Sequence, residues 1–226
     1  MQLEPKNDLQ APPPEIQEIF QDNIREYFYQ IQLYNAAIKE VRTKLEILDE
    51  EFSVRYSHNP IHHMEYRLKK PKSIIEKLQR KNLPISVESM TKNLYDIAGV
   101  RVICNYIEDV YRVADLLVSQ DDVTEVRVRD YIKEPKDNGY RSLHLVVSIP
   151  IFLAEKTVPV LVEVQIRTIA MDFWASLDHQ LRYKTEESVP AGLKERLKTC
   201  ADTITSLDSE MQSIYKELKE GQPNHE

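Results

Sequence analysis

Two neighbouring stretches organise the chain, DYIKEPKDNGYRSLH (residues 130–144) and VEVQIRT (residues 162–168). The first is a polar loop with a turn-forming Asn-Gly pair that leads into alternating apolar residues, so a loop feeding a strand is predicted. A purine nucleotide suits its side chains, because an aromatic ring stacks on a base while Lys and Arg meet phosphate oxygens. A solvated basic loop beside a hydrogen-bonded strand acid, Glu163, is the alternative for this stretch alone. The candidate binding side chains are Lys133, Lys136, Tyr140, Arg141 and His144.

The composition is that of a globular protein with long, charged helices. Of the 226 residues, 42% are hydrophobic and 30% are charged, which is enough for one well-buried domain or for one domain with an appended helical element. A formal net charge of −7 and a pI near 5.5 argue against a protein whose whole surface binds nucleic acid. A local basic cleft on an acidic body is compatible with both values.

The cysteines and the distribution of apolar residues indicate the compartment. Cys104 lies in a strand-like run and Cys200 in a helical one, so they make neither a disulfide framework nor a zinc ligand set, and two buried thiols are expected. No stretch approaches the roughly 20 apolar residues of a membrane span. The amino terminus also lacks the pattern of a signal peptide. We therefore expect a cytoplasmic protein with no membrane partner.

The chain begins with a predicted tail and a long helix. Residues 1–14 are polar and end in three prolines, which exclude a helix interior and favour a disordered tail. Residues 15–52 contain neither Pro nor Gly, and their apolar residues recur at the spacing of an amphipathic helix. One long helix is predicted, or a close pair with a break near Tyr34 and Asn35.

Residues 58–63, HNPIHH, are interpreted as a loop. Their three histidines, His58, His62 and His63, invite a metal hypothesis. Cys and carboxylate partners are missing, and Pro60 interrupts a helical face between His58 and His62, so a loop is favoured over a metal site.

The segment RLKKPKSIIEK (residues 67–77) brings polar side chains to the start of a helix. Pro71 suits the first turn of a helix, so residues 65–69 are predicted to be extended and residues 71–81 helical. Backbone N–H groups and the helix dipole favour an anion there, which predicts a phosphate site. A charged surface helix is the alternative. The candidate phosphate-binding side chains are Arg67, Lys69, Ser73 and Lys77.

The remaining elements predict a mixed sheet flanked by helices. Asp96 precedes an alternating strand whose Arg101 points away from the apolar side, an arrangement that could hold Mg²⁺ and contact a nucleotide, although an isolated Asp there is more often a turn residue. The last helix carries an apolar stripe that needs a partner surface. Helices are predicted at 87–94, 108–120, 169–183 and 192–220, and strands at 100–104, 123–129, 143–149 and 158–168.

Four of these motifs together resemble the synthetase domain of the RelA/SpoT family, the enzymes that make the alarmones ppGpp and pppGpp. They are RLKKPKSIIEK, DIAGVRVI, KDNGYRSLH and VEVQIRTIAMDFWASLDH, and they span residues 67–184. Long members of the family also carry a hydrolase domain with an HD-x-x-ED motif and regulatory domains, and the 226 residues here have neither that motif nor that length. The resemblance is therefore to the stand-alone small alarmone synthetases of the RelP and RelQ type, and it implies a nucleotidyltransferase-like α/β (α+β) fold with long terminal helices.

The resemblance implies a GTP pyrophosphokinase without hydrolase activity. Pyrophosphate would pass from ATP to the 3′-hydroxyl of GDP or GTP, with release of AMP. Asp96 would bind Mg²⁺, and Glu163 would be a second ligand or the base for the 3′-hydroxyl, while Tyr140 would stack on guanine. The ATP-binding residues would be Arg67 and Arg101 at the adenine and Lys69, Ser73 and Lys77 at the phosphates. The residues orienting GDP or GTP would be Lys133, Lys136, Asn138, Arg141, His144, Gln165 and Arg167.

The resemblance also implies an organisation into a tail (1–14), a synthetase domain (15–184) and a helical extension (185–226) that builds a homotetramer. Some small synthetases are stimulated by their product at a site between subunits. Here that neighbourhood carries Glu46, His62 and His63 in place of basic and aromatic residues, which favours an unregulated or differently regulated enzyme.

Two other classes of function compete with the enzyme. One is a binding module that uses the same fold to hold a nucleotide or single-stranded RNA without catalysis. Asp96 and Glu163 argue against it, because a pure anion binder gains nothing from carboxylates among phosphates. A helical scaffold assembled through the terminal helices would leave the central motifs unexplained.

Overall fold

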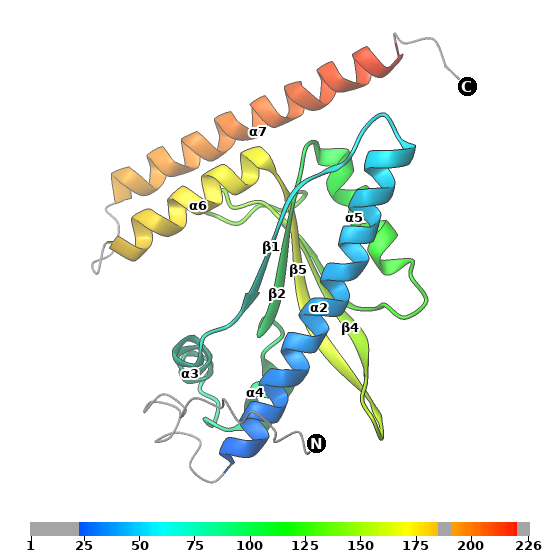
Figure 1. Cartoon of the computed structure of the whole chain (residues 1–226). Coiled ribbons are helices and arrows are strands. Elements are labelled where there is room, and N and C mark those ends of the chain that lie inside the picture. Colours follow the sequence, from blue (N-terminus) through cyan, green and yellow to red (C-terminus); the bar gives the residue numbers. More distant parts are fainter. Residues whose placement is uncertain (1–22, 185–190, 221–226) are drawn as a thin grey trace, which may run out of the picture.

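A computed structural model describes residues 23–184 and 191–220, and its centre is one mixed sheet (Figure 1). The sheet has five strands in the order β1-β2-β5-β4-β3. Only the pair β2 and β5 is parallel, while the other neighbours are antiparallel. The strands are β1 (Ile61–Leu68), β2 (Ala98–Cys104), β3 (Thr124–Asp130), β4 (Leu143–Phe152) and β5 (Thr157–Thr168).

The helices fall into three groups around the sheet. Two of them, α2 and α5, pack on the same sheet face, and α6 and α7 lie side by side across one end of the molecule (Figure 1). The short α3 and α4 lie at the other end. The helices are α2 (Ile24–Arg55), α3 (Pro71–Arg80), α4 (Val87–Asn93), α5 (Ile107–Val118), α6 (Ile169–Lys184) and α7 (Ala191–Glu220). The predicted α/β class, with its long helices, is confirmed.

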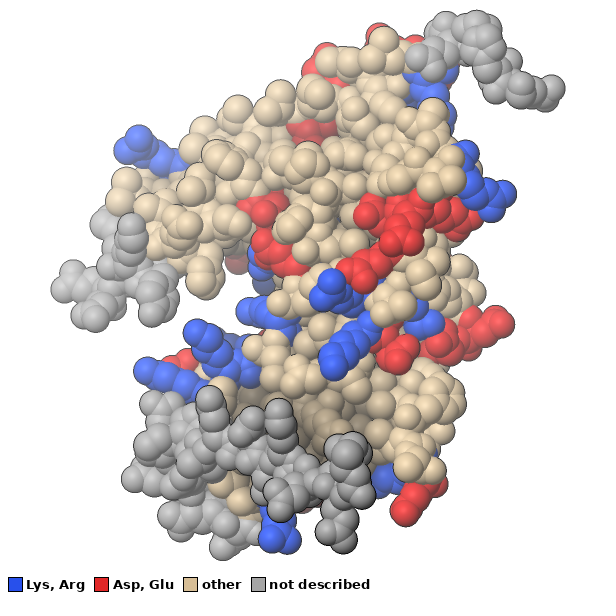
Figure 2. All heavy atoms as spheres, in the orientation of Figure 1, with Lys and Arg blue, Asp and Glu red and all other residues tan. Residues whose placement is uncertain are grey.

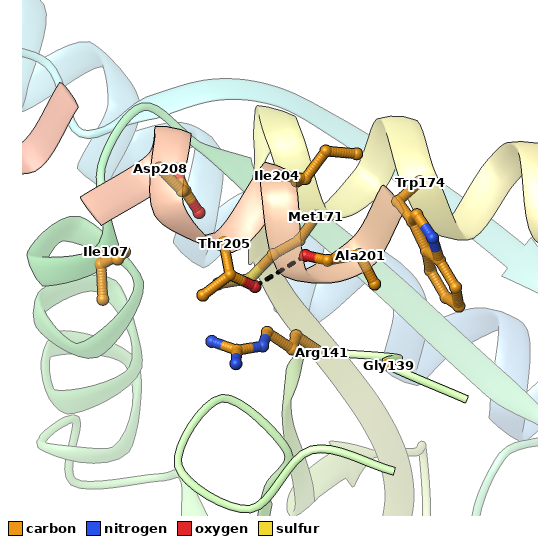
Figure 3. Close-up of a pocket in the computed structure, with 9 residues that line it drawn as sticks. All are labelled: Ile107, Gly139, Arg141, Met171, Trp174, Ala201, Ile204, Thr205 and Asp208. Carbon is orange, nitrogen blue, oxygen red and sulfur yellow. Dashed lines mark hydrogen bonds between the residues drawn. The ribbon is translucent and has the colours of Figure 1, made fainter. Parts of the chain in front are cut away.

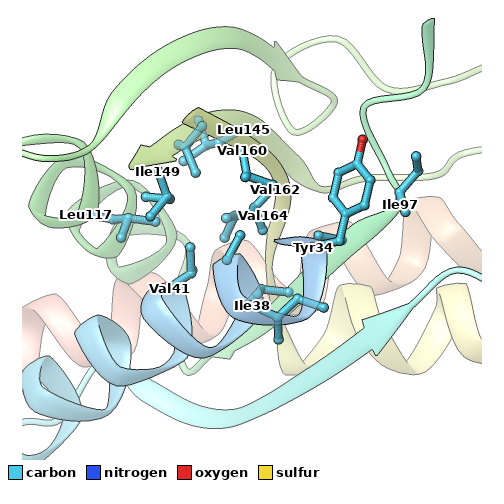
Figure 4. Packing of buried hydrophobic residues seen from close by; sticks show 14 of the residues in the cluster. Tyr34, Ile38, Val41, Ile97, Leu117, Leu145, Ile149, Val160, Val162 and Val164 are labelled. Carbon is cyan, nitrogen blue, oxygen red and sulfur yellow. The ribbon is translucent and has the colours of Figure 1, made fainter. Parts of the chain in front are cut away.

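The hydrophobic core lies on the sheet face that α2 and α5 cover, which leaves polar side chains on the opposite face, here called the bare face. Alternate side chains of a strand point to opposite faces. The apolar set on β5, Val160, Val162 and Val164, packs with Ile38 and Val41 of α2 in one buried cluster (Figure 4). The residues that alternate with them, such as Glu163 and Gln165, therefore face away from α2, on the side of the sheet where the site lies.

The helix α2 matches the first of the two predicted alternatives, one long helix, and not a close pair. Residues 24–55 form a single helix, so the break near Tyr34 and Asn35 is absent. Tyr34 and Ala37 are both buried, so the apolar stripe passes through this point without interruption. The predicted tail, residues 1–14, and the start of the predicted helix lie outside the described residues.

Two other predictions require correction. Ile61, His62 and His63 begin β1 and are not part of a loop, because Ile61 and His63 pair with residues of β2. Pro60 thus marks the entrance to a strand. Cys104 is buried as predicted, but Cys200 is exposed on α7, because it lies on the same outward side of that helix as Leu193 and Leu207.

The long helix α7 packs on the body along one side only. Trp174 of α6 donates from Nε1 to the carbonyl oxygen of Leu197 at 3.0 Å. The backbone N–H of Glu108, at the start of α5, donates to Oε1 of Gln212 at 2.9 Å. Much of the predicted apolar stripe still faces outward, at Leu193, Leu207, Met211 and Ile214. Within the described residues, no helix is both long and apolar enough to cross a membrane.

Candidate active site

Strand register brings the polar residues of the bare sheet face into two rows. In the first row, Glu163 of β5 pairs with Gly99 of β2, which pairs with Arg67 of β1. The second row, two residues along each strand, runs through Glu65, Arg101, Gln165, His144 and Arg129. Because residues two apart share a face, both rows lie together.

Glycine at position 99 allows Arg67 to lie flat on the sheet. A Cβ added at Gly99 would come within 3.2 Å of Cγ and 3.3 Å of Nε of Arg67. Arg101 continues this basic surface, and its Nη1 donates to Oε2 of Glu65 at 3.0 Å. The two guanidinium groups line one groove with Gly99 and Gln165, a surface suited to a flat aromatic ligand.

Asp96 lies just before β2 and is buried among two lysines. Its Oδ2 accepts hydrogen bonds from Nζ of Lys69 at 2.9 Å and from Nζ of Lys77 at 2.6 Å. Burial raises the pKa of Asp96, but the hydrogen bonds from Lys77 and Lys69 outweigh it, so the pKa lies below its ordinary value. The carboxylate is therefore ionised at neutral pH. Its other oxygen, Oδ1, is buried and has no hydrogen-bond partner.

Glu163 is held by its neighbours in the sheet. Nε2 of Gln165 donates to its Oε2 at 2.8 Å, and Nδ1 of His144 lies 3.5 Å from its Oε1. Burial raises the pKa of Glu163, and the interactions with His144 and Gln165 lower it further than burial raises it. The net pKa is below the ordinary value, so Glu163 is a carboxylate at neutral pH on a rigid strand.

A hydrogen-bonded chain links Glu163 to the aromatic residue of the loop. The hydroxyl of Tyr140 lies 2.8 Å from Nε2 of His144 and accepts a hydrogen bond from Nη2 of Arg167 at 3.0 Å. The same Nη2 donates to Oε1 of Gln165 at 2.8 Å. Burial raises the pKa of Tyr140, so its hydroxyl stays protonated. Nζ of Lys136 lies 4.7 Å above the Tyr140 ring.

These side chains line two open clefts that share the central strands. Figure 2 shows Lys and Arg side chains gathered where the surface is hollowed between α6 and α3. The cleft that contains both acids is lined by Lys77, Lys81, Asn93, Tyr95, Asp96, Arg127, Arg129, Tyr131, Lys136, His144, Val146 and Glu163. The second, beside α6, is lined by Arg67, Arg101, Tyr140, Gln165, Arg167, Ala175, Ser176, Asp178, His179 and Gln180.

Most of the predicted site residues line these clefts, and Lys69 reaches the first through its hydrogen bond to Asp96, but four lie elsewhere or at the margin. Ser73 is in the first turn of α3, one turn before Lys77. The Lys133 side chain is exposed, with Nζ 3.5 Å from Oδ2 of Asp130. Asn138 donates from Nδ2 to Oδ2 of Asp178 at 3.4 Å. Arg141 points into a separate small pocket under α7 (Figure 3).

Sequence reasoning missed several residues of the site. Arg127 and Arg129 alternate in β3 and line the cleft with the acids, a signal that the pattern VRVR already contained. Asp172 carried no such signal. Its Oδ1 lies 3.6 Å from Nη1 of Arg101 and 3.4 Å from Nη1 of Arg167, which joins two strands to the first turn of α6.

The two acids form a donor set that fits a hard divalent cation. Asp96 and Glu163 line one cleft, and Asp96 offers a buried oxygen without a partner. Within the described residues no group of three or more His, Cys, Asp or Glu side chains could hold a metal, and His58, His62 and His63 make no such cluster. A cation bound here by one or two carboxylates would complete its shell with substrate phosphates and water, as Mg²⁺ does.

A mixed sheet that carries two ionised acids among Lys and Arg side chains is typical of nucleotidyltransferase-like enzymes that move phosphate groups. The family described as "Region found in RelA / SpoT proteins" matches residues 66–188. The GTP pyrophosphokinase YwaC of Bacillus subtilis is 43% identical over 189 residues, which cover 84% of this chain and 90% of the relative. The chain therefore belongs to the RelA/SpoT family.

Solved structures agree with this assignment. The crystal structure of small alarmone synthetase 2 from Bacillus subtilis has a TM-score of 0.78 and 42% identity, and the match covers 85% of this chain and 99% of that one. Small alarmone synthetase 1 from the same organism, bound to its product pppGpp, has a TM-score of 0.76 and 38% identity over 81% of this chain and 93% of that one.

Proposed function

We propose that this protein is a GTP pyrophosphokinase that makes ppGpp and pppGpp from ATP and GDP or GTP. The observation that carries the proposal is the placement of Asp96 and Glu163 in one cation-lined cleft. In the reaction the 3′-oxygen of the acceptor forms a bond to the β-phosphorus of ATP. The bond from that phosphorus to the α,β-bridging oxygen breaks, and AMP leaves. Relatives named GTP pyrophosphokinase support the assignment.

Glu163 is assigned the role of base. Its carboxylate is ionised and held by Gln165 and His144, so it can accept the proton of the 3′-hydroxyl as the new bond forms. A carboxylate on a strand is positioned more firmly than one on a loop. Transfer of this kind requires mainly alignment and cations where charge develops, and the cleft supplies both.

The ATP half of the site is assigned to α3 and the β1–β2 pair. Arg67 and Arg101 offer flat cationic surfaces for adenine. Lys69 and Ser73 lie at the start of α3, where the helix favours phosphate, and Lys77 extends from the same helix one turn after Ser73. Asp96, with Glu163, would hold Mg²⁺, which neutralises charge on the phosphates when bound.

The acceptor half is assigned to the loop between β3 and β4 and the strand ends beside it. Tyr140 provides the stacking surface for guanine. The cations near it suit the phosphates of GDP or GTP. They are Lys136 and Arg167, with Arg127 and Arg129 added from β3, and His144 and Gln165 are polar contacts. Lys133 and Asn138, at the margin of the clefts, are assigned to the acceptor with them.

Replacing Tyr140 with Ala is expected to weaken GDP binding about 5-fold to 150-fold, equivalent to about 1–3 kcal/mol of stacking. Tyr140→Phe keeps the ring and removes only the hydroxyl that contacts His144 and Arg167, so it should retain most of the affinity. Calorimetric titration with GDP and with a non-hydrolysable ATP analogue separates the two halves. An equal loss of ATP affinity in Tyr140→Ala would contradict the assignment.

The proposed activity is tested by incubating the purified chain with γ-labelled ATP, Mg²⁺ and GDP or GTP. Label should appear in guanosine tetra- or pentaphosphate with a matching amount of AMP, and chelation of the metal should abolish it. Absence of transfer, together with nucleotide or RNA binding that falls as salt rises, would instead indicate the non-catalytic binding module.

We also propose that the enzyme works in the cytoplasm as a homotetramer, with residues 185–226 contributing the contacts. The outward sides of α6 and α7 support this, because they expose apolar side chains that a second copy could cover: Phe173, Leu177, Leu181, Leu193, Leu207, Met211, Ile214 and Leu218. Both cysteines are free, which suits a reducing compartment.

A charge on this apolar side is expected to break the assembly. Light scattering should give the mass of four chains for the wild type and a smaller mass for the double variant Leu207→Glu, Met211→Glu, since charges buried at an interface are costly. Ser206→Glu, on the exposed polar side of the same helix, is the control. A wild type that is monomeric at all concentrations would refute the tetramer.

A further inference from the structure

The loop that carries Tyr140 rests on α7. We name residues 131–142, between β3 and β4, the acceptor loop. Gly139 in this loop has φ of +87°, and a Cβ added there would lie 2.4 Å from Cβ of Ala201. That separation leaves no space for an added atom, so the loop backbone is pressed directly against the buried side of α7 (Figure 3).

Arg141, on the other side of Tyr140, also turns toward α7. It lines a small pocket with Thr205 and Asp208 of that helix, and Figure 3 shows its guanidinium group beneath them. Asp208 is only 6% exposed. Burial raises the pKa of Asp208, and the hydrogen bond from Thr168 and the positive charge of Arg141 both oppose that rise.

Asp208 also holds the end of β5. Its Oδ2 accepts a hydrogen bond from Oγ1 of Thr168 at 2.6 Å. Thr168 follows Arg167, whose Nη2 donates to the Tyr140 hydroxyl. One buried carboxylate of α7 therefore contacts the strand that carries Arg167 and faces the loop residue next to Tyr140.

The helix that provides these contacts is itself firmly seated. Gln212 accepts from the backbone N–H of Glu108, and the ring of Tyr215 stacks on that of Tyr106 with centroids 4.2 Å apart. Lys216 forms an ion pair with Glu108. These contacts lie one to two turns beyond Asp208, so α7 is fixed on α5 where it backs the acceptor loop.

We infer that Ala201 and Asp208 are positioning residues for the acceptor nucleotide, and that Arg141 anchors the acceptor loop to α7 instead of contacting the nucleotide. The inference rests on the proposed function. Tyr140 lies between two residues that are both held by α7, so the ring can meet guanine only if that helix keeps its place. ATP, bound by β1, β2 and α3, is independent of these contacts.

The first test adds bulk where the loop touches the helix. Ala201→Leu should displace Gly139 and raise the KM for GDP by roughly 10-fold to 100-fold, the scale of a misplacement of about 1 Å. The KM for ATP should stay within about twofold of wild type, because α3 and β1 are untouched. Ser206→Leu adds the same side chain to the exposed polar side of α7 and should leave both KM values unchanged.

The second test asks whether Arg141 acts through Asp208. Asp208→Asn keeps an oxygen for Thr168 but removes the charge, and Arg141→Ala removes the other partner. Each should raise the KM for GDP several-fold, and the double variant should be no worse than the more damaging single variant. If Arg141 contacted the nucleotide directly, the two effects would multiply and the anchoring role would be overturned.

The outcomes separate this inference from the proposed function. A wild type that makes no guanosine tetra- or pentaphosphate would refute the function itself. A wild type that makes product would refute the inference if Ala201→Leu changed neither KM or raised both equally. Thermal melting of every variant, with Ala201→Gly as a less bulky change at the same position, distinguishes a displaced loop from a chain that has failed to fold.

Discussion

Replacing Glu163 with Gln is expected to lower the rate of pyrophosphate transfer by about 10²–10⁴-fold, the range that a positioned general base contributes. The amide keeps the size of the side chain and can still accept from Gln165, so the strand and its neighbours should stay in place. What it loses is the ability to take the proton of the 3′-hydroxyl. ATP affinity should change little, because the proposed adenine and phosphate contacts come mainly from β1, β2 and α3.

The measurement is single-turnover transfer from γ-labelled ATP to GDP, with ATP binding measured in parallel. Glu125→Gln provides a matched control, since it makes the same change on an exposed residue of β3. Turnover of Glu163→Gln equal to wild type would remove this residue from the role of base. A large loss of ATP affinity would instead assign Glu163 chiefly to metal binding.

Replacing Asp96 with Asn is expected to reduce turnover by about 10²–10³-fold, the effect typical of losing one electrostatic contact to the transition state. The change removes an oxygen ligand with full charge, so the Mg²⁺ concentration needed for half-maximal rate should rise. It also releases Lys69 and Lys77 from their shared carboxylate. Binding of ATP without metal should therefore become tighter, not weaker.

The melting temperature of the protein should also depend on the Asp96 carboxylate, independently of catalysis. The pKa of Asp96 is lowered in the fold, so its stabilising effect is present above its ordinary pKa and is lost as the pH falls through the lowered value. Asp96→Asn should thus melt at a lower temperature than wild type at pH 7, with the difference shrinking under acidic conditions. If Asp96→Asn needed the same Mg²⁺ concentration as wild type for half-maximal turnover, Asp96 would be excluded as a metal ligand.

Single helices and strands were predictable because the residue types that begin them and the spacing of their apolar residues can be read from a short stretch of sequence. Pro71 begins α3 as its residue type requires, since the first turn of a helix does not need the missing N–H. Glu163 was predicted to lie on a strand, and it does, in β5, where buried valines alternate with it. The expectation failed at His62 and His63, because the pairing of Ile61 with Cys104 extends β1 beyond what Pro60 suggested locally.

The composition of the site, in contrast, depends on which strands become neighbours. By itself the sequence determined the polar side of each strand, the start of α3 and the motifs that mark the family. Only the tertiary structure decided that Glu163 lies beside Gly99, that Asp172 meets Arg101 and Arg167, and that Arg141 turns from the cleft toward α7. Periodicity within an element is set by backbone geometry, whereas the partner that a side chain finds on another element is set by how whole elements pack.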